Sequence, residues 1–184
     1  MARCKLYPVN FPLIPMTNLH FPLLFLLTLF LFAGCSELPE QDMPQTRSYA
    51  IRLKPGEDLK KSIQKFVDDN QIEAGWIASC AGSLTDYHIR FANVPEGSKA
   101  SGHFEIVSLS GTLSTNGSHI HVSVSDNTGK TIGGHLMDEC LVYTTAEIVI
   151  QSASDLQFTR ENDGTTEWKE LQVKQKGEDV RDSD

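Results

Sequence analysis

The sequence lacks an excess of basic side chains, and it has no dense basic patch. Lysine and arginine number 16 against 24 aspartates and glutamates, which gives a formal net charge of −8. The densest basic segment, residues 52–69, is interleaved with acids, as is typical of the solvated face of a helix. Because an acidic chain repels phosphate backbones, non-specific affinity for nucleic acid should be poor. We therefore expect no nucleic-acid partner.

The chain also lacks a paired CxxC motif, so its cysteines are not counted as metal ligands. Cys80 and Cys140 stand among apolar or small residues, and their spacing fits two buried free thiols as well as one disulfide. With 184 residues, the chain is too short for two large folded domains. The sequence predicts one ordinary domain with appendages.

The amino terminus has the pattern of an export signal. Arg3 and Lys5 precede residues 21–33, a short and almost uninterrupted apolar run that small residues follow. This order is typical of a secretory signal peptide rather than of a mature transmembrane helix. The long stretch before the apolar run leaves two possible start sites, Met1 and Met16.

The end of the apolar run, LFAGC at residues 31–35, resembles the lipobox of bacterial lipoproteins. In that family the signal is cut before the cysteine, which is then lipidated. The resemblance implies a signal peptide over residues 1–34 and a lipid anchor on Cys35. Ser36 after the cysteine implies sorting to the periplasmic side of the outer membrane, in a bacterial cell envelope. A plain cleaved signal or an uncleaved anchor is the alternative.

The remaining chain divides into a linker, a folded domain and a tail. Residues 35–46 carry prolines and acids and suit a linker, residues 47–174 should fold, and residues 175–184 form a charged tail that we expect to be disordered. Residues 57–70 predict an amphipathic helix because their apolar side chains fall at helical spacing. Alternating strand patterns dominate elsewhere. The fold class is therefore α+β, a mostly antiparallel β-sheet with one main helix.

Strands are predicted at residues 49–53, 73–83, 84–92, 102–109 with an extension at 111–113, 139–152, 156–160 and 167–173, besides the hairpin described next. A bend at Gly82 and Ser83 should separate the second strand from the third. Simple alternation places Ile106 and Leu109 on opposite faces of their strand.

Three of the six histidines stand in one predicted hairpin, GSHIHVSVSDNTGKTIGGHL at residues 117–136. Side chains of His119 and His121 share one face because successive strand residues point to opposite sides. A tight turn that pairs Asp126 with Lys130 would place His135 directly opposite His121. The three imidazoles would then form one cluster.

Three neutral imidazoles with an open fourth position are a ligand set that zinc uses in catalytic sites. His119, His121 and His135 are therefore the predicted metal ligands, with zinc as the cofactor. Glu105, on the neighbouring predicted strand, is the first candidate for a catalytic carboxylate, although a surface or subunit-contact charge is the alternative. For the histidines the alternative is the solvated face of an antiparallel sheet.

Three ordered motifs resemble the PPC (plants-and-prokaryotes-conserved) domain: GSL at 82–84, GHFEIVSLSG at 102–111 and SHIHVSVSDNTGKTIGGHL at 118–136. The resemblance covers residues 48–173. It implies the PPC fold of stand-alone prokaryotic members, which resemble homotrimers. Plant members carry an AT-hook, but no Arg-Gly-Arg-Pro hook occurs here, and His103 stands where the plant motif has arginine. A DNA-binding role therefore does not carry over.

The family's fold is also similar to zinc-dependent acetolactate decarboxylases, which hold their metal with an H-x-H pair and a later histidine. Only His119, His121 and His135 match that pattern, so whether the protein is an enzyme stays open. The first hypothesis is an exported, lipid-anchored zinc enzyme. The second is a non-catalytic homotrimeric module that binds a small molecule, and a DNA-binding regulator is the third and weakest.

Overall fold

The structure is a computed structural model that describes residues 45–176. The predicted signal peptide, Cys35, nearly all of the predicted linker and most of the predicted tail lie outside the described residues. The strands are β1 (Thr46–Leu53), β2 (Gly75–Arg90), β3 (Gly97–Leu113), β4 (His119–Ser125), β5 (Thr131–Leu136), β6 (Leu141–Ala153), β7 (Leu156–Glu161) and β8 (Glu170–Gln175). One helix, α2 (Leu59–Asp69), stands among them in the described part of the chain. The predicted α+β class is confirmed.

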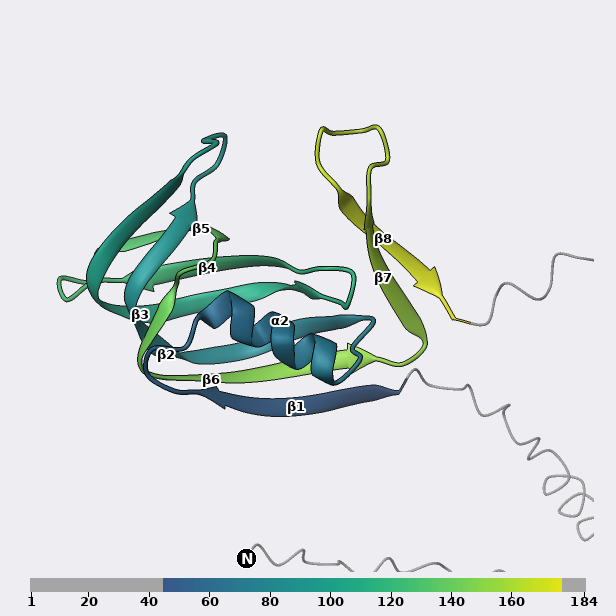
Figure 1. Cartoon of the computed structure of the whole chain (residues 1–184), viewed down its shortest axis with the longest axis horizontal. Coiled ribbons are helices and arrows are strands. Elements are labelled where there is room, and N and C mark those ends of the chain that lie inside the picture. The colour runs from purple at the N-terminus through teal and green to yellow at the C-terminus, as the bar shows by residue number, and fades with distance from the viewer. Residues whose placement is uncertain (1–44, 177–184) are drawn as a thin grey trace, which may run out of the picture. The chain divides into compact units, whose positions relative to one another are not determined.

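Six strands form one antiparallel sheet in the order β1-β6-β2-β3-β4-β5. β7 and β8 form a separate hairpin that stands away from this sheet (Figure 1). The core consists of the apolar side chains that the strands direct inward together with the buried face of α2. Among residues 45–176, no helix is both long enough and apolar enough to span a bilayer.

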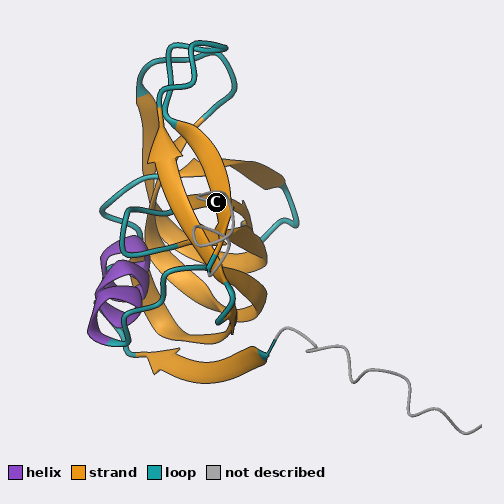
Figure 2. Ribbon diagram, turned by 90° about the vertical axis from the view of Figure 1, so that its right-hand side faces the viewer, coloured by secondary structure: helices purple, strands orange, loops and turns teal. Residues whose placement is uncertain are grey.

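Helix α2 lies along one side of the sheet (Figure 2). Asp58 caps its first turn, because its side chain accepts a hydrogen bond of 3.0 Å from the backbone N–H of Lys61. Leu59, Ile63 and Val67 are fully buried, as their helical spacing predicts. The helix starts two residues later than predicted because Asp58 is its cap.

The predicted break in the second strand is wrong, since β2 runs without interruption from Gly75 to Arg90. Shifts of register on either side of Leu84 absorb the bend within the strand. Gly82 does not form a turn, because it lies within the continuous strand β2. A Cβ atom there would collide with the backbone of Thr145, so the glycine allows β6 to approach β2 closely.

A bulge also changes the faces of β3. The register shifts between Ile106 and Ser108, and Val107 is 58% exposed at that point. Ile106 and Leu109 are consequently both buried. Simple alternation had placed them on opposite faces, and the extra residue of the bulge is the reason that this prediction is wrong.

The edge strand β5 also pairs with β2, a strand in the middle of the sheet. β5 pairs with β4 along most of its length, and its end also pairs with the end of β2, where Ile89 lies opposite Leu136 and Arg90 opposite His135. Strands β2, β3, β4 and β5 therefore close a ring at this end of the fold. Gly134 makes the closure possible, because a Cβ atom there would collide with the carbonyl oxygen of Arg90.

Both cysteines of the described region are free thiols. The Cys140 sulfur accepts a hydrogen bond of 3.1 Å from the backbone N–H of His88. His88 stands eight residues beyond Cys80 along β2, which corresponds to about 25 Å of extended strand. A disulfide needs Cα atoms within about 7 Å of each other, so this fold keeps the two thiols apart.

Candidate metal centre

The histidine hairpin has the predicted register. The backbone N–H of Asp126 donates to the carbonyl of Lys130 at 3.0 Å, and Gly129 adopts a φ of +84° in the turn. The Asp126 carboxylate fixes the loop by accepting hydrogen bonds from the backbone N–H groups of Thr128 and Lys130. His121 consequently lies directly opposite His135.

Burial of the opposite face holds the histidines outward. Ile120, Val122 and Val124 are each at most 3% exposed. Because the side chains of a strand alternate, His119 and His121 must then point away from the core. Hydrophobic burial therefore sets the orientation of the two imidazoles, since a shift of one residue would expose the three apolar side chains.

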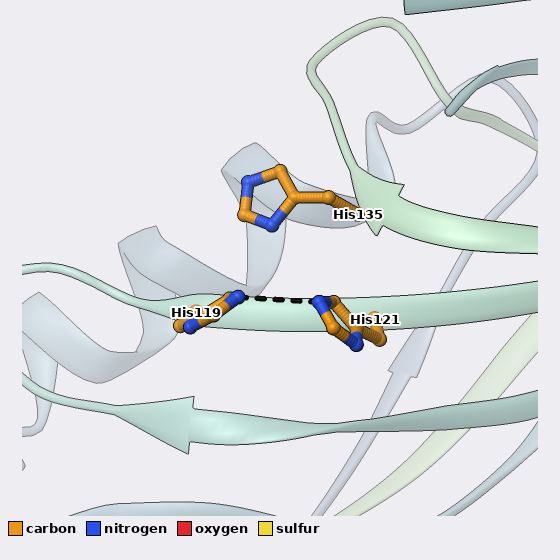
Figure 3. A group of neighbouring side chains, drawn as sticks. All are labelled: His119, His121 and His135. Atoms are coloured by element: carbon orange, nitrogen blue, oxygen red, sulfur yellow. Dashed lines mark hydrogen bonds between the residues drawn. The ribbon is translucent and has the colours of Figure 1, made fainter. Parts of the chain in front are cut away.

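The three rings converge (Figure 3). Their centroids are 4.9 Å apart for His119 and His121, 5.1 Å for His119 and His135, and 5.9 Å for His121 and His135. The two Nε2 atoms of His119 and His121 lie 3.2 Å apart. One ring nitrogen from each residue lies within 4.8 Å of the other two. The cluster that the sequence predicted is present.

The environment keeps two of these imidazoles neutral. Burial lowers the pKa of His135 to about 4, with further contributions from the charges of His119 and Arg90. Burial also lowers the pKa of His119, assisted by the positive charge of Arg160, while Glu170 acts in the opposite direction. Neutral imidazole is the form that binds a metal, so both rings are available as ligands at neutral pH.

The donor set fits a divalent metal ion. Nδ1 of His135 is buried without a hydrogen-bond partner in the described part of the chain, as expected of a nitrogen that is free to bind an ion. Two ligands at about 2.0–2.1 Å from one tetrahedral zinc lie roughly 3.3 Å apart. The distance of 3.2 Å between the Nε2 atoms of His119 and His121 is close to that value. The cluster could hold a metal ion.

Within residues 45–176, no carboxylate or thiol joins the three histidines as a fourth ligand. A set of three protein ligands leaves one coordination position for water or a small molecule. Structural zinc sites usually close with four protein ligands.

A cavity of about 590 Å³ adjoins His119 and His135. This volume is within the usual range for small-molecule sites. Its other walls come from separate elements: Arg90 at the end of β2, Arg160 on β7, Trp168 and Lys169 just before β8, and Glu170 as the first residue of β8. No motif or periodicity in the sequence marks any of these residues. They meet only through the β2–β5 closure and the position of the β7–β8 hairpin.

Glu105 lies elsewhere on the sheet. It is exposed on β3, opposite Ser125, whereas His121 lies opposite Ser110 further along the same strand. The only acid among the residues that line the cavity is Glu170. Glu105 and the histidines are thus not brought together, and its catalytic role stays a prediction.

Comparison with known proteins finds a matching family model and a similar curated protein. The model of a family described as the Plants and Prokaryotes Conserved (PCC) domain matches residues 40–154. The bifunctional protein GlmU of Synechococcus sp. (strain JA-3-3Ab) is 40% identical over 132 residues, which are 72% of this chain and 21% of that protein. This chain therefore spans about a fifth of the length of the curated relatives that it matches first.

Two solved structures are also similar. A hypothetical protein from Salmonella enterica is 41% identical, with a TM-score of 0.71, and the match covers 72% of this chain and 96% of that one. A metal-containing protein from Archaeoglobus fulgidus is 28% identical, with a TM-score of 0.59 and coverage of 68% and 93%. The match to the family model ends at residue 154, before the β7–β8 hairpin begins.

Proposed function

The chain belongs to the Plants and Prokaryotes Conserved (PCC) domain family, and we propose that its three-histidine cluster is a zinc site with an open coordination position. The convergence of His119, His121 and His135 within 4.8 Å is the observation that carries this proposal. The metal-containing protein from Archaeoglobus fulgidus, which has a similar fold, supports it.

Imidazole nitrogen is a ligand that zinc prefers, and three such ligands would leave a fourth coordination position free. Two of the three histidines, His119 and His135, line the cavity. Zinc bound there would act as a Lewis acid on a carbonyl oxygen or on water. The described chain supplies the surroundings of that position. Glu170 places a carboxylate on the same cavity, where it can accept or donate a proton, and Trp168 and Met137 provide apolar walls. These features favour a zinc-dependent enzyme for a small substrate.

The alternative within the same site is a module that binds a small ligand without turnover. An enzyme needs a second polar group beside the metal within a pocket, and the cavity beside His119 and His135 contains one in Glu170. This observation favours the enzyme. Once a substrate is known, its turnover by Glu170→Gln can be compared with its turnover by the wild type. Turnover by the wild type that falls in the variant supports the enzyme, and binding without turnover supports the binding module.

Metal analysis tests the zinc proposal directly. Protein purified without added metal should contain about one zinc per chain, and His121→Ala should lose it. His103→Ala is the matched control, because His103 is exposed on β3 and contacts Tyr143 rather than the cluster. A wild-type protein that binds no divalent metal, even after incubation with zinc, would refute the proposal.

We also propose that the mature protein is anchored to the cell envelope through a lipid on Cys35, on the periplasmic side of the outer membrane. The lipobox-like segment at residues 31–35 supports this anchor. A fatty-acid analogue fed to cells should label the wild type, and Cys35→Ser should abolish the label. An unlabelled wild-type protein would favour ordinary secretion instead.

A homotrimer is the third part of the proposal. Its support is the resemblance to stand-alone family members, together with the exposed apolar side chains of Val107 and Tyr143, which are 58% and 42% exposed. Sedimentation equilibrium of the purified protein should give three times the mass of the chain. A monomeric mass at micromolar concentration would contradict the trimer.

A further inference from the structure

The cavity beside the histidines has a charge opposite to that of the whole chain. The chain carries a net charge of −8, yet three basic side chains and only one acidic side chain line this cavity. The basic residues come from three different places, Arg90 on β2, Arg160 on β7 and Lys169 just before β8. A concave surface with more basic than acidic side chains attracts anions.

Arg160 lines this cavity and carries an unsatisfied hydrogen-bond donor. Its Nη1 atom is buried, and no hydrogen-bond partner for it exists within residues 45–176. The backbone of Arg160 is fixed, because its N–H donates a hydrogen bond of 2.7 Å to the side-chain oxygen of Asn116. A buried guanidinium nitrogen without a partner is costly, so an acceptor on a ligand would satisfy it.

Arg90 also lines the cavity, from the end of β2. Its Cζ atom lies 5.6 Å from the centroid of the Trp168 ring, in the arrangement of a cation–π contact. In the described part of the chain, neither Arg90 nor Arg160 forms a salt bridge with any carboxylate. No carboxylate of the described residues therefore neutralises either guanidinium charge through a direct ion pair.

We propose that the cavity binds a small organic carboxylate, whose charged group is held by Arg160 and Arg90 and whose apolar part lies against Trp168 and Met137. Guanidinium groups match the planar geometry of a carboxylate through paired N–H donors. A small carboxylate would then be the substrate class of the zinc site. This step rests on the proposed function, because the ligand would make its second contact at the open coordination position of the metal. The positive charge of the two arginines would attract the carboxylate in the metal-free protein as well.

The β7–β8 hairpin determines this specificity. It supplies Arg160 and Trp168, and it lies beyond residue 154, where the match to the family model ends. The histidines, in contrast, lie within the matched region. The metal ligands thus belong to the part shared with the family, whereas one side of the anion site comes from the hairpin.

Benzoate is a suitable probe because it combines a carboxylate with a flat apolar ring. Calorimetry should detect its binding to the full chain, both zinc-loaded and chelated, while benzyl alcohol, the uncharged comparison, should bind at least tenfold more weakly. Arg160→Met and Arg90→Met should each weaken benzoate binding by about tenfold or more, since each loses charge-assisted hydrogen bonds.

Arg47→Met is the matched control. Arg47 also lies over an aromatic ring, that of Tyr49, but on β1 and not in the cavity.

The outcomes separate this inference from the zinc proposal. Arginine-dependent binding of benzoate to a protein that takes up no zinc would support the anion site while the metal proposal fails. A zinc-loaded protein that binds no benzoate, or that binds it equally in all variants, would overturn the anion site alone. Arginine-dependent binding of inorganic phosphate without binding of benzoate would overturn the assignment to carboxylates. Circular dichroism spectra should show that each variant is folded.

Discussion

Arg90 lies directly opposite His135 where the end of β2 pairs with the end of β5. This two-residue ladder joins the charged wall of the cavity to the third histidine of the cluster. The guanidinium charge contributes to the lowered pKa of His135. A change that opens the ladder should therefore disturb the metal site and the cavity together.

Gly134→Ala should open this ladder. An added Cβ atom would collide with the carbonyl oxygen of Arg90 and would lie 3.0 Å from Cγ2 of Ile89. Overpacking of this kind typically costs about 1–3 kcal/mol of the free energy of unfolding. Urea unfolding of the metal-free protein measures the loss, and zinc titration should show weaker binding. Thr131→Ala, an exposed change on the same strand, should alter stability by less than about 0.5 kcal/mol. Equal stability of the two variants would contradict the steric argument.

Ile120→Ala should destabilise β4, the strand that carries two of the three clustered histidines. Ile120 is 1% exposed and stands between His119 and His121. Truncation of a fully buried isoleucine costs about 2–5 kcal/mol, since it leaves a cavity in the core. Val173→Ala provides the control, because Val173 is 54% exposed on β8 and should change stability little. If urea unfolding gives similar losses for both variants, Ile120 does not anchor β4.

Glu170→Gln should lower the pKa of His119 in the metal-free protein. The negative charge of Glu170 favours the protonated imidazole, so its removal makes protonation harder. Titration of His119 by NMR between pH 4 and 8 measures this shift. Glu105→Gln should leave the titration unchanged, because Glu105 lies on another part of the sheet and does not line the cavity. A larger effect of Glu105→Gln would show that Glu105 is the carboxylate that acts on the cluster.

Cys80 and Cys140 should react slowly with thiol reagents in the folded protein. Burial raises the pKa of both thiols from 9.0 to about 11. With Cys4 and Cys35 replaced by serine, modification at pH 8 should be about a hundredfold slower than in urea, because far less thiolate is present. Rapid modification under native conditions would show that these thiols are accessible.

The same two thiols give a pH dependence with a definite sign. Their pKa values are higher in the folded protein than in the unfolded chain, so between pH 9 and 11 the unfolded chain has lost protons that the folded protein retains. Their contribution to stability is fully present below pH 9 and is lost as the pH rises through 11. Urea unfolding at pH 8 and pH 10, compared with Cys140→Ser, measures this contribution. A wild type that becomes more stable than the variant as the pH rises would contradict it.

The sequence by itself determined the histidine hairpin. Alternation of Ile120, Val122 and Val124 with polar residues defined the two faces of β4, and the turn chemistry of Asp126 and Gly129 defined its partner. Both signals are local, since a strand with one buried face and a tight turn together allow only one register. The helix, the fold class and the convergence of the three histidines followed from signals of this kind.

Only the tertiary structure decided which residues surround the cluster. The bulges of β2 and β3 depend on how closely neighbouring strands approach, and simple alternation did not contain that information. Arg90 reaches His135 because the sheet closes on itself, and Arg160 and Trp168 reach the cavity because a separate hairpin stands beside it. These contacts join residues distant in sequence, and no local periodicity encodes them. The three-histidine cluster was therefore predictable from the sequence, whereas the charged walls of the adjoining cavity were not.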